Sequence, residues 1–309
     1  MHNVDSEKYS FNIKANNNQR FLTQKRISMK RIIFTIVIVS LASHASAQVP
    51  INKNNKSDSV NRIERTEKKY QELFAQQIMP SKTDPELMNI LQRFIFGEVF
   101  YTGNLDDKTR ELITITVLTT NQTLPQLKGH TNAALNIGVT PIEIREVVYQ
   151  TAPFIGFPKV LNALDTINSV FKTRGIKLPL ENKGTVNEDN RLERGKEKQV
   201  PLYGEGMRKN MKDLPGGFGE TIPDMLTETC FGDFYTRGGL DIKTRELTIF
   251  CALATLGGTE RQMTSHAVGN LKVGNSKETM ISAMIQCYPY IGFPRVSNAI
   301  NVLKDAKVD

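Results

Sequence analysis

The chain has 309 residues and a formal net charge of +8. Seven of its 40 basic residues but only two of its 32 acidic residues lie in the first 47 positions, so the excess positive charge is concentrated there. From residue 48 onward 33 basic and 30 acidic residues remain, a formal net charge of +3, which gives no argument for binding to nucleic acid.

The N-terminal segment has the features of a secretory signal peptide. Met29-Lys30-Arg31 is a short basic head, Ile32–Ala42 is an apolar run, and Ala45-Ser46-Ala47 is a small-residue cleavage site. The apolar run is shorter than the ~20 residues that span a bilayer, and a short membrane anchor is the alternative. We expect Met29 to be the true start and cleavage to follow Ala47. The product would then be periplasmic or secreted, with no membrane contact.

Two sequence patterns occur twice in the remaining 262 residues. The octet LDDKTREL at Leu105–Leu112 returns as LDIKTREL at Leu240–Leu247, 135 residues later. The stretch IGFPKVLNAL at 155–164 returns as IGFPRVSNAI at 291–300, 136 residues later. The chain therefore contains two copies of one unit, and the second copy has one extra residue between the two patterns.

The extra residue falls in LGGT at 256–259, opposite TNQT at 120–123, which predicts a turn because loops absorb insertions most easily. The two units extend over about 59–174 and 191–308. Residues 175–190 are polar, with Gly and Pro, and are predicted to be a linker.

Most of each unit is predicted to be helical. TPIEIREVVYQ and SKETMISAMIQC each begin with Thr or Ser beside early acidic residues, as helices do. LITITVL alternates and is rich in β-branched residues, which locally suggests a strand, but its counterpart LTIFCALATL has the pattern of a buried helix. Since two copies of one unit share a fold, we predict an all-α protein with two tandem helical domains.

Each octet is predicted to begin a helix. Asp106 and Asp241 are natural N-caps. Arg110 and Arg245 follow in the first turn with a lysine each, where positive charge opposes the helix dipole. Either an acidic partner within or between the units balances this charge, or an anion binds there.

Only two histidines lie after residue 47, and they occupy equivalent positions. The midpoints between Glu111 and His130 and between Glu246 and His266 both fall in the predicted turns. Residues equidistant from the turn of an antiparallel helical hairpin lie at the same level, so each copy would pair a carboxylate with an imidazole. Such a pair suits proton transfer near neutral pH, although a histidine on an apolar helix is often only a core residue.

The three cysteines are predicted to be small buried hydrophobic residues. Cys230, Cys251 and Cys287 show no CxxC or metal-binding spacing, and at best one pair forms a disulfide. One histidine per copy is too few for a typical zinc site, so no metal is predicted.

The segments RFIFGEVFYTGNLDDKTREL, NIGVTPIEI and IGFPKVLNAL, together with the histidine, resemble the carboxymuconolactone decarboxylase family. The wider superfamily includes AhpD-like alkylhydroperoxidases. The resemblance covers most of both units, so the chain resembles a tandem fusion of two family domains. It implies helical bundles that assemble into a homo-oligomeric ring, and decarboxylation or proton transfer on a small carboxylated lactone without a cofactor.

The resemblance also implies roles for individual residues. The histidines would act as general acids oriented by the glutamates, and arginines would hold the substrate carboxylate. The candidate catalytic residues are His130, Glu111, His266, Glu246, Glu98 and Asp233, and the candidate substrate-binding residues are Arg110, Arg245 and Arg237. We expect both copies to contribute.

Two departures from the family pattern leave the substrate open. Phe100 and Tyr235 stand where the decarboxylase branch has tryptophan, and the expected export separates the protein from a cytoplasmic degradation pathway. The peroxidase branch needs a CxxC pair close before the histidine, and 124–126 and 260–262 contain no cysteine. Peroxidase activity is therefore not expected. A non-catalytic protein that binds a small acid or serves in an assembly is the alternative to an enzyme.

Overall fold

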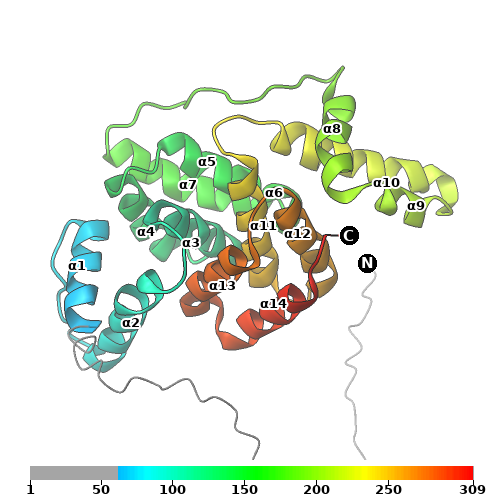
Figure 1. Cartoon of the computed structure of the whole chain (residues 1–309). Helices are drawn as coiled ribbons and strands as arrows, with labels where there is room; N and C mark the ends of the chain where they lie inside the picture. Colours follow the sequence, from blue (N-terminus) through cyan, green and yellow to red (C-terminus); the bar gives the residue numbers. More distant parts are fainter. Residues whose placement is uncertain (1–61, 309) are drawn as a thin grey trace, which may run out of the picture. The chain divides into compact units, whose positions relative to one another are not determined.

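The computed structural model describes residues 62–308, and every secondary-structure element in this range is a helix (Figure 1). The predicted all-α fold is confirmed. The predicted signal peptide and Met29, the expected start, lie outside the described residues. None of the helices between residues 62 and 308 is long and apolar enough to cross a membrane.

The two copies contain corresponding series of helices. The first copy contains α1 (Arg62–Phe74), α2 (Pro85–Gly97), η1 (Val99–Tyr101), α3 (Asp107–Asn121), α4 (Leu124–Asn136), α5 (Pro141–Tyr149), α6 (Ala152–Ile155) and α7 (Phe157–Thr173). The second contains α8 (Arg191–Tyr203), α9 (Gly206–Met211), η2 (Pro215–Gly217), α10 (Phe218–Leu226), the π-helix η3 (Thr227–Tyr235), α11 (Ile242–Leu256), α12 (Glu260–Lys272), α13 (Lys277–Ile291) and α14 (Phe293–Asp305).

Both octets begin a helix as predicted. The side chain of Asp106 accepts a hydrogen bond from the backbone N–H of Thr109 at 2.7 Å, and Asp241 accepts one from Thr244 at 3.0 Å. These bonds satisfy N–H groups that have no partner inside the helix, and they fix where α3 and α11 begin. The position of every later residue on these two helices follows from that start.

The segment LITITVL is helical although its letters alternate like those of a strand. The hydroxyls of Thr114, Thr116 and Thr120 donate to the carbonyl oxygens four residues earlier, at 2.8–2.9 Å. A buried threonine in a helix therefore has its hydroxyl satisfied without any sheet partner. The alternation reflects these polar threonines and does not reflect the two faces of a strand.

One apolar cluster joins the two copies. Helix α3 of the first copy packs directly against α11 of the second, and both are buried over most of their length (Figure 1). Ile113 and Val117 of α3 belong to the same apolar cluster as Phe250 and Met284 of the second copy. The described residues accordingly fall in a single compact unit.

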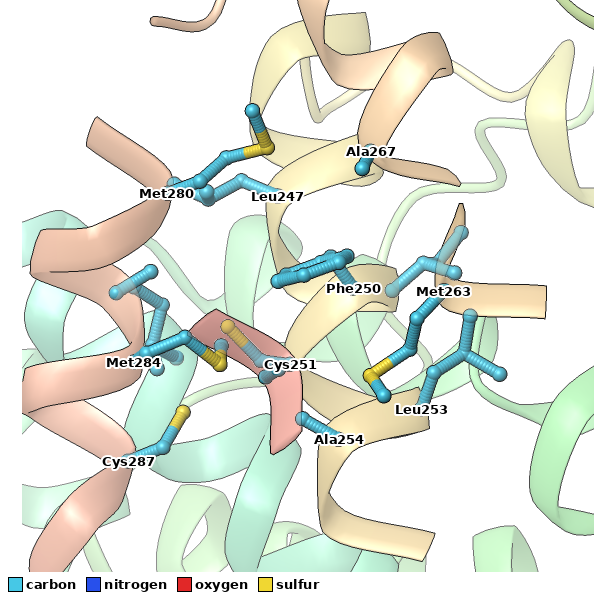
Figure 2. Close-up of a cluster of buried hydrophobic side chains, with 14 of the residues drawn as sticks. Leu247, Phe250, Cys251, Leu253, Ala254, Met263, Ala267, Met280, Met284 and Cys287 are labelled. Atoms are coloured by element: carbon cyan, nitrogen blue, oxygen red, sulfur yellow. The ribbon is translucent and has the colours of Figure 1, made fainter. Parts of the chain in front are cut away.

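The cysteines belong to this cluster. Cys230, Cys251 and Cys287 are buried and free, as predicted for small apolar residues. Figure 2 shows Cys251 and Cys287 among the side chains of Met284 and Ala254. Burial raises the pKa of the Cys251 thiol far above its ordinary value, and its contact with Cys287 adds to this effect. The Cys251 thiol is therefore protonated and unreactive.

Candidate functional site

Each copy places a glutamate against a histidine across a helical hairpin. Glu111 on α3 lies 2.9 Å from Nδ1 of His130 on α4, and Glu246 on α11 lies 3.1 Å from Nδ1 of His266 on α12. Both glutamates are fully buried. The pairing predicted from the distance of each residue to the turn is confirmed. The catalytic role of the pairs stays a prediction.

In the second copy two tyrosines hold the glutamate. The hydroxyl of Tyr203 donates to Glu246 at 2.6 Å and lies 2.8 Å from Nδ1 of His266, and the hydroxyl of Tyr235 donates to Glu246 at 2.7 Å. Burial, and then the charge of Glu246, hold the pKa of both phenols well above the usual range. Both phenols therefore remain protonated donors at any physiological pH.

This network fixes the orientation and tautomer of the second-copy imidazole. Because the Tyr203 proton goes to Glu246, Nδ1–H of His266 donates to the Tyr203 oxygen and to Glu246. The remaining ring nitrogen, Nε2, has no hydrogen-bond partner among the residues that the structure describes. It is therefore the atom that is free to exchange a proton with a ligand.

The first copy lacks both phenols. Phe74 and Phe100 occupy the positions equivalent to Tyr203 and Tyr235, and the Phe74 ring lies 5.7 Å from the ring of His130. Within residues 62–308, His130 is the one side chain that hydrogen-bonds to Glu111. The first glutamate is thus held less firmly than the second.

Each histidine also contacts an aromatic residue from the other copy. Tyr290 of α13 packs against His130 at 5.7 Å between ring centroids, and its hydroxyl lies 3.5 Å from Nε2. Phe154 of α6 packs against His266 at 5.5 Å. Tyr290 and Phe154 are equivalent positions, two residues before the glycine of each IGFP motif. Each site is therefore completed by the other copy, with a phenol in one case and an apolar ring in the other.

A cleft of about 750 Å³ lies beside His266. Its wall is mainly apolar, and among the residues from 62 to 308 the charged ones that line it are Arg261 and Lys272, with no aspartate or glutamate. Lys272 donates to the backbone carbonyl of Leu202 at 2.8 Å. Arg261 is exposed and has no hydrogen-bond or ion-pair partner in the described part of the chain. The cleft therefore offers one uncommitted positive charge in the same lining as the imidazole.

Arg110, a predicted substrate-binding residue, is occupied by the protein itself. It is 1% exposed and donates to the backbone carbonyls of Val99, Thr102 and Leu105 at 2.8–3.2 Å. A further bond at 3.1 Å reaches the side chain of Gln286 in the other copy. Arg110 ties the loop before α3 to that helix, which explains why both octets contain this arginine.

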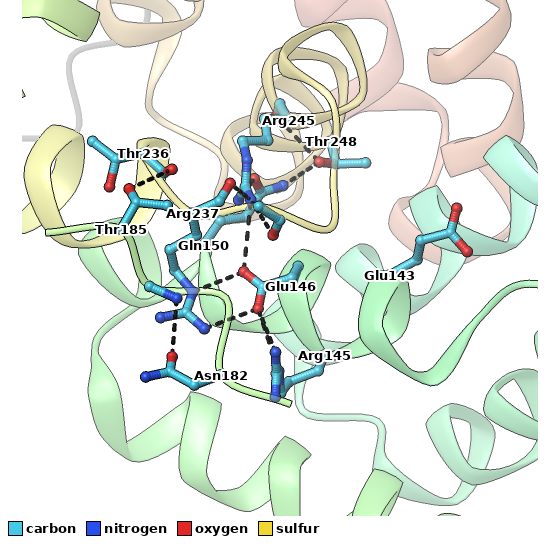
Figure 3. A network of polar contacts seen from close by, with 12 residues as sticks. Glu143, Arg145, Glu146, Gln150, Asn182, Thr185, Thr236, Arg237, Arg245 and Thr248 are labelled. Carbon is cyan, nitrogen blue, oxygen red and sulfur yellow. Dashed lines mark hydrogen bonds and ion pairs between the residues drawn. The ribbon is translucent and has the colours of Figure 1, made fainter. Parts of the chain in front are cut away.

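Arg245 and Arg237, the other two predicted substrate-binding residues, surround a carboxylate of the protein. Arg237 binds Glu146 of the first copy through two hydrogen bonds at 2.8 and 3.0 Å, Arg145 binds it at 2.9 Å, and Arg245 lies at 3.6 Å (Figure 3). Burial alone would raise the pKa of Glu146, but the hydrogen bonds and charges of the arginines overcome this and lower it. The acidic partner expected between the units is therefore Glu146.

Glu98 and Asp233 are not joined to the glutamate–histidine pairs by any described contact. Glu98 forms an ion pair with Arg62 at 2.5 Å, and Asp233 forms the equivalent pair with Arg191 at 2.7 Å. Their side chains are 46% and 38% exposed. The geometry gives them a role in joining α1 to α2 and α8 to η3, and it gives no support to a role in proton transfer.

Several residues around the second site were not among those predicted. Tyr235 was noted only as a replacement for tryptophan, and Tyr203 lies outside the repeated motifs. Arg261 is five residues before His266 on α12. A comparison of the two copies could have identified the tyrosines, because the first copy has Phe74 and Phe100 at the equivalent positions.

Comparison with known proteins agrees with this architecture. The model of the Carboxymuconolactone decarboxylase family matches residues 85–168 and 220–305, one region in each copy. Two curated relatives are similar over part of the chain. The 4-carboxymuconolactone decarboxylase of Acinetobacter baylyi is 34% identical over 91 residues, 29% of this chain and 68% of the relative. The nitrosuccinic acid decarboxylase of Metarhizium robertsii is 32% identical over 94 residues, 29% of this chain and 66% of the relative.

A crystal structure described as a gamma-carboxymuconolactone decarboxylase subunit from Burkholderia xenovorans is 20% identical, with a TM-score of 0.46, over 79% of this chain and 94% of that one. The family model covers just over half of the chain, in two separate copies. The chain therefore belongs to the carboxymuconolactone decarboxylase family.

Proposed function

We propose that the protein is a cofactor-independent decarboxylase of carboxylic acids, and that Glu246 and His266 of the second copy alone form its working site, in place of the contribution from both copies that the sequence suggested. The observation that carries this proposal is the free Nε2 of a tightly oriented imidazole, beside a cleft whose lining charges are positive. Among the relatives, two are named for decarboxylation, one of 4-carboxymuconolactone and one of nitrosuccinic acid.

The chemistry makes three demands on the protein. A carboxylate must be held, the electron pair left behind when carbon dioxide departs must be delocalised within the substrate, and a proton must be delivered to the carbon. Arg261 supplies the uncommitted positive charge that the first demand requires. It holds a carboxylate that remains on the substrate, so that the departing carboxylate lies against the apolar wall, where charge is poorly solvated.

His266 supplies the proton. In the protonated imidazole, Nδ1–H donates to Tyr203 and Glu246, and Nε2–H faces the ligand. As the bond to carbon dioxide breaks, the electron pair passes into the acceptor group of the substrate, and Nε2–H then forms the new C–H bond. The neutral imidazole regains its proton from water. The carboxylate of Glu246, held against Nδ1, balances the positive charge of the ring.

The test is incubation of the protein in D₂O with 4-carboxymuconolactone, nitrosuccinate and a panel of related acids. We expect release of carbon dioxide and incorporation of one deuteron at the carbon that lost it, in a single configuration. A protein that only binds acids would show binding heat with no carbon dioxide from any of them. That result would refute the proposed enzyme activity and favour the alternative function, a non-catalytic protein that binds small acids.

We also propose that the protein is exported and that residues 1–47 are removed. The support is the basic head, the apolar run and the Ala45-Ser46-Ala47 site. N-terminal sequencing of protein secreted by a bacterial host should begin at Gln48. A secreted product that retains Met29 would contradict this proposal.

A further inference from the structure

We infer that the cleft of the second copy takes carboxylic acids with a long or aromatic apolar body, larger than the acids named for the two decarboxylase relatives. This inference rests on the proposed function, because it concerns the ligand of the same site. It is carried by the volume of the cleft, the residues of its wall and the distribution of charge around it.

The size of the cleft exceeds what a small lactone needs. Ligand pockets of about 300–1,000 Å³ typically enclose drug-sized molecules. The cleft beside His266 measures about 750 Å³, in the upper part of that range. A substrate of about a dozen non-hydrogen atoms would leave much of this apolar wall in contact with water, which is unfavourable.

The wall is built for an apolar body. Aliphatic and aromatic side chains from five elements line it: Leu202 of α8, Met207 and Met211 of α9, Leu226 of α10, Phe231 of η3 and Phe154 of α6. Met207 and Met211 are one helical turn apart, so they present adjacent flexible side chains to the same ligand. Methionine adapts its shape to different apolar partners, which suits a site for acids of varied body.

The charges favour one anchored carboxylate. Lys272 is engaged by the carbonyls of Leu202 and Pro201, at 2.8 and 3.4 Å, which leaves Arg261 as the uncommitted charge in the lining. With no acidic side chain in the wall, a cationic or zwitterionic ligand would find no partner for its positive charge. One carboxylate bound by Arg261 matches the free charge of the lining, and the departing carboxylate of the proposed reaction lies with the apolar body of the ligand against the rest of the wall.

Phe154 is the residue that we expect to set specificity. It belongs to the first copy but lines the second-copy cleft, and its ring stands edge-on to His266 at an interplanar angle of 74°. The equivalent residue at the other site is Tyr290, whose hydroxyl approaches His130. The second site therefore has an apolar ring where the first has a polar group, directly beside the imidazole.

The experiment is isothermal titration of the full chain with straight-chain carboxylates from butanoate to dodecanoate, and with the matched alcohols. Each methylene that becomes buried should tighten binding about fourfold until the cleft is filled. The alcohols should bind at least ~10-fold more weakly than the acids, because they lack the charge-assisted bond to Arg261.

Two variants with matched controls locate the effect. Arg261→Gln should remove the preference for acid over alcohol, and Arg194→Gln, at an exposed arginine paired with Glu197 outside the cleft, should keep it. Phe154→Ala should flatten the dependence on chain length. Phe157→Ala, at an aromatic residue that is 55% exposed and outside the cleft lining, should leave it unchanged.

The outcomes separate this inference from the proposed function. Affinity that does not change with chain length, in a protein that decarboxylates small acids, would overturn the inference and leave the function standing. Chain-length dependence without any decarboxylation would support the inference and refute the enzyme. Loss of all binding as the protein concentration is raised would mean that a second copy covers the cleft, which would also overturn the inference.

Discussion

The two glutamate–histidine pairs have the same backbone origin and different surroundings. In both copies the octet starts a helix at an aspartate N-cap, and the following hairpin brings glutamate and histidine together. In the second copy two phenols hold the glutamate and Nε2 is free, whereas in the first copy the phenols are replaced by phenylalanine and Tyr290 approaches Nε2. The glutamate–histidine pair is the same in both copies. Side chains from helices outside the hairpin determine the hydrogen bonds of the glutamate and whether Nε2 of the histidine has a partner.

The same asymmetry appears where the two copies meet, and the largest effect on stability is expected there. Glu146 is fully buried among three arginines, and the equivalent position in the second copy is Ser282. Removing one partner of a buried ion pair costs about 3–5 kcal/mol, because it leaves uncompensated charge. Glu146→Gln should lower the free energy of unfolding by about this amount at pH 7, as measured by urea denaturation.

The pH dependence of stability checks the assignment to Glu146. Because its pKa is lower in the folded protein, its stabilising contribution is complete above the unfolded pKa of about 4.3 and is lost as pH falls through the folded pKa. Wild type should lose stability below about pH 5 more steeply than Glu146→Gln. Glu181→Gln, at an exposed glutamate, is the control and should follow wild type. Parallel curves for all three proteins would refute the assignment.

The next largest effect sharpens the comparison between the two glutamates. Glu246 accepts hydrogen bonds from Tyr203, Tyr235 and His266, whereas Glu111 has one such donor in the described contacts, His130. Hydrogen bonds to a charged group contribute about 1.5–3 kcal/mol each, and an amide replaces them only in part. Glu246→Gln should therefore cost about 3 kcal/mol in urea unfolding and Glu111→Gln about 1 kcal/mol. Equal losses would show that the two environments are equivalent.

A smaller effect is expected from exchanging the phenol beside the histidine. Tyr203→Phe removes the hydroxyl that donates to Glu246 and contacts Nδ1 of His266, and it gives the second copy the phenylalanine that the first copy has at Phe74. We expect Tyr203→Phe to lower kcat about 10-fold, which corresponds to one lost hydrogen bond of about 1.4 kcal/mol, with little change in KM. A rise in KM at unchanged kcat would instead make Tyr203 a residue that contacts the ligand.

The sequence predicts the hairpins because the relevant signals are local. The N-cap aspartates lie within the octets, and Glu111 and His130 are 19 residues apart, so their meeting follows from helix geometry alone. The threonines of LITITVL give a misleading strand pattern, and only the comparison with the second copy resolves it. The fold class and the two pairs were therefore predictable from the repeat.

The remainder of the site depends on contacts distant in the chain. Tyr203 is 63 residues from His266, Glu146 is 91 residues from Arg237, and Tyr290 is 160 residues from His130. Arg110 and Arg245 are residues of a type that often binds carboxylate substrates. In this fold they donate to loop carbonyls and contact side chains of the other copy, which no local pattern reveals. The glutamate–histidine contact in each copy follows from the sequence, whereas the engagement of the three arginines by the protein itself does not.

The division between the copies is tested most directly by replacing each histidine in turn. His266→Ala should lower kcat by about 10²–10⁴-fold, the usual loss when a general acid is removed. His130→Ala should leave turnover per folded molecule near that of wild type and lower Tm, because His130 packs between Phe74 and Tyr290. Both variants are assayed for carbon dioxide release together with their thermal unfolding. A loss of kcat in His130→Ala as large as that in His266→Ala would contradict the claim that the second copy alone holds the working site.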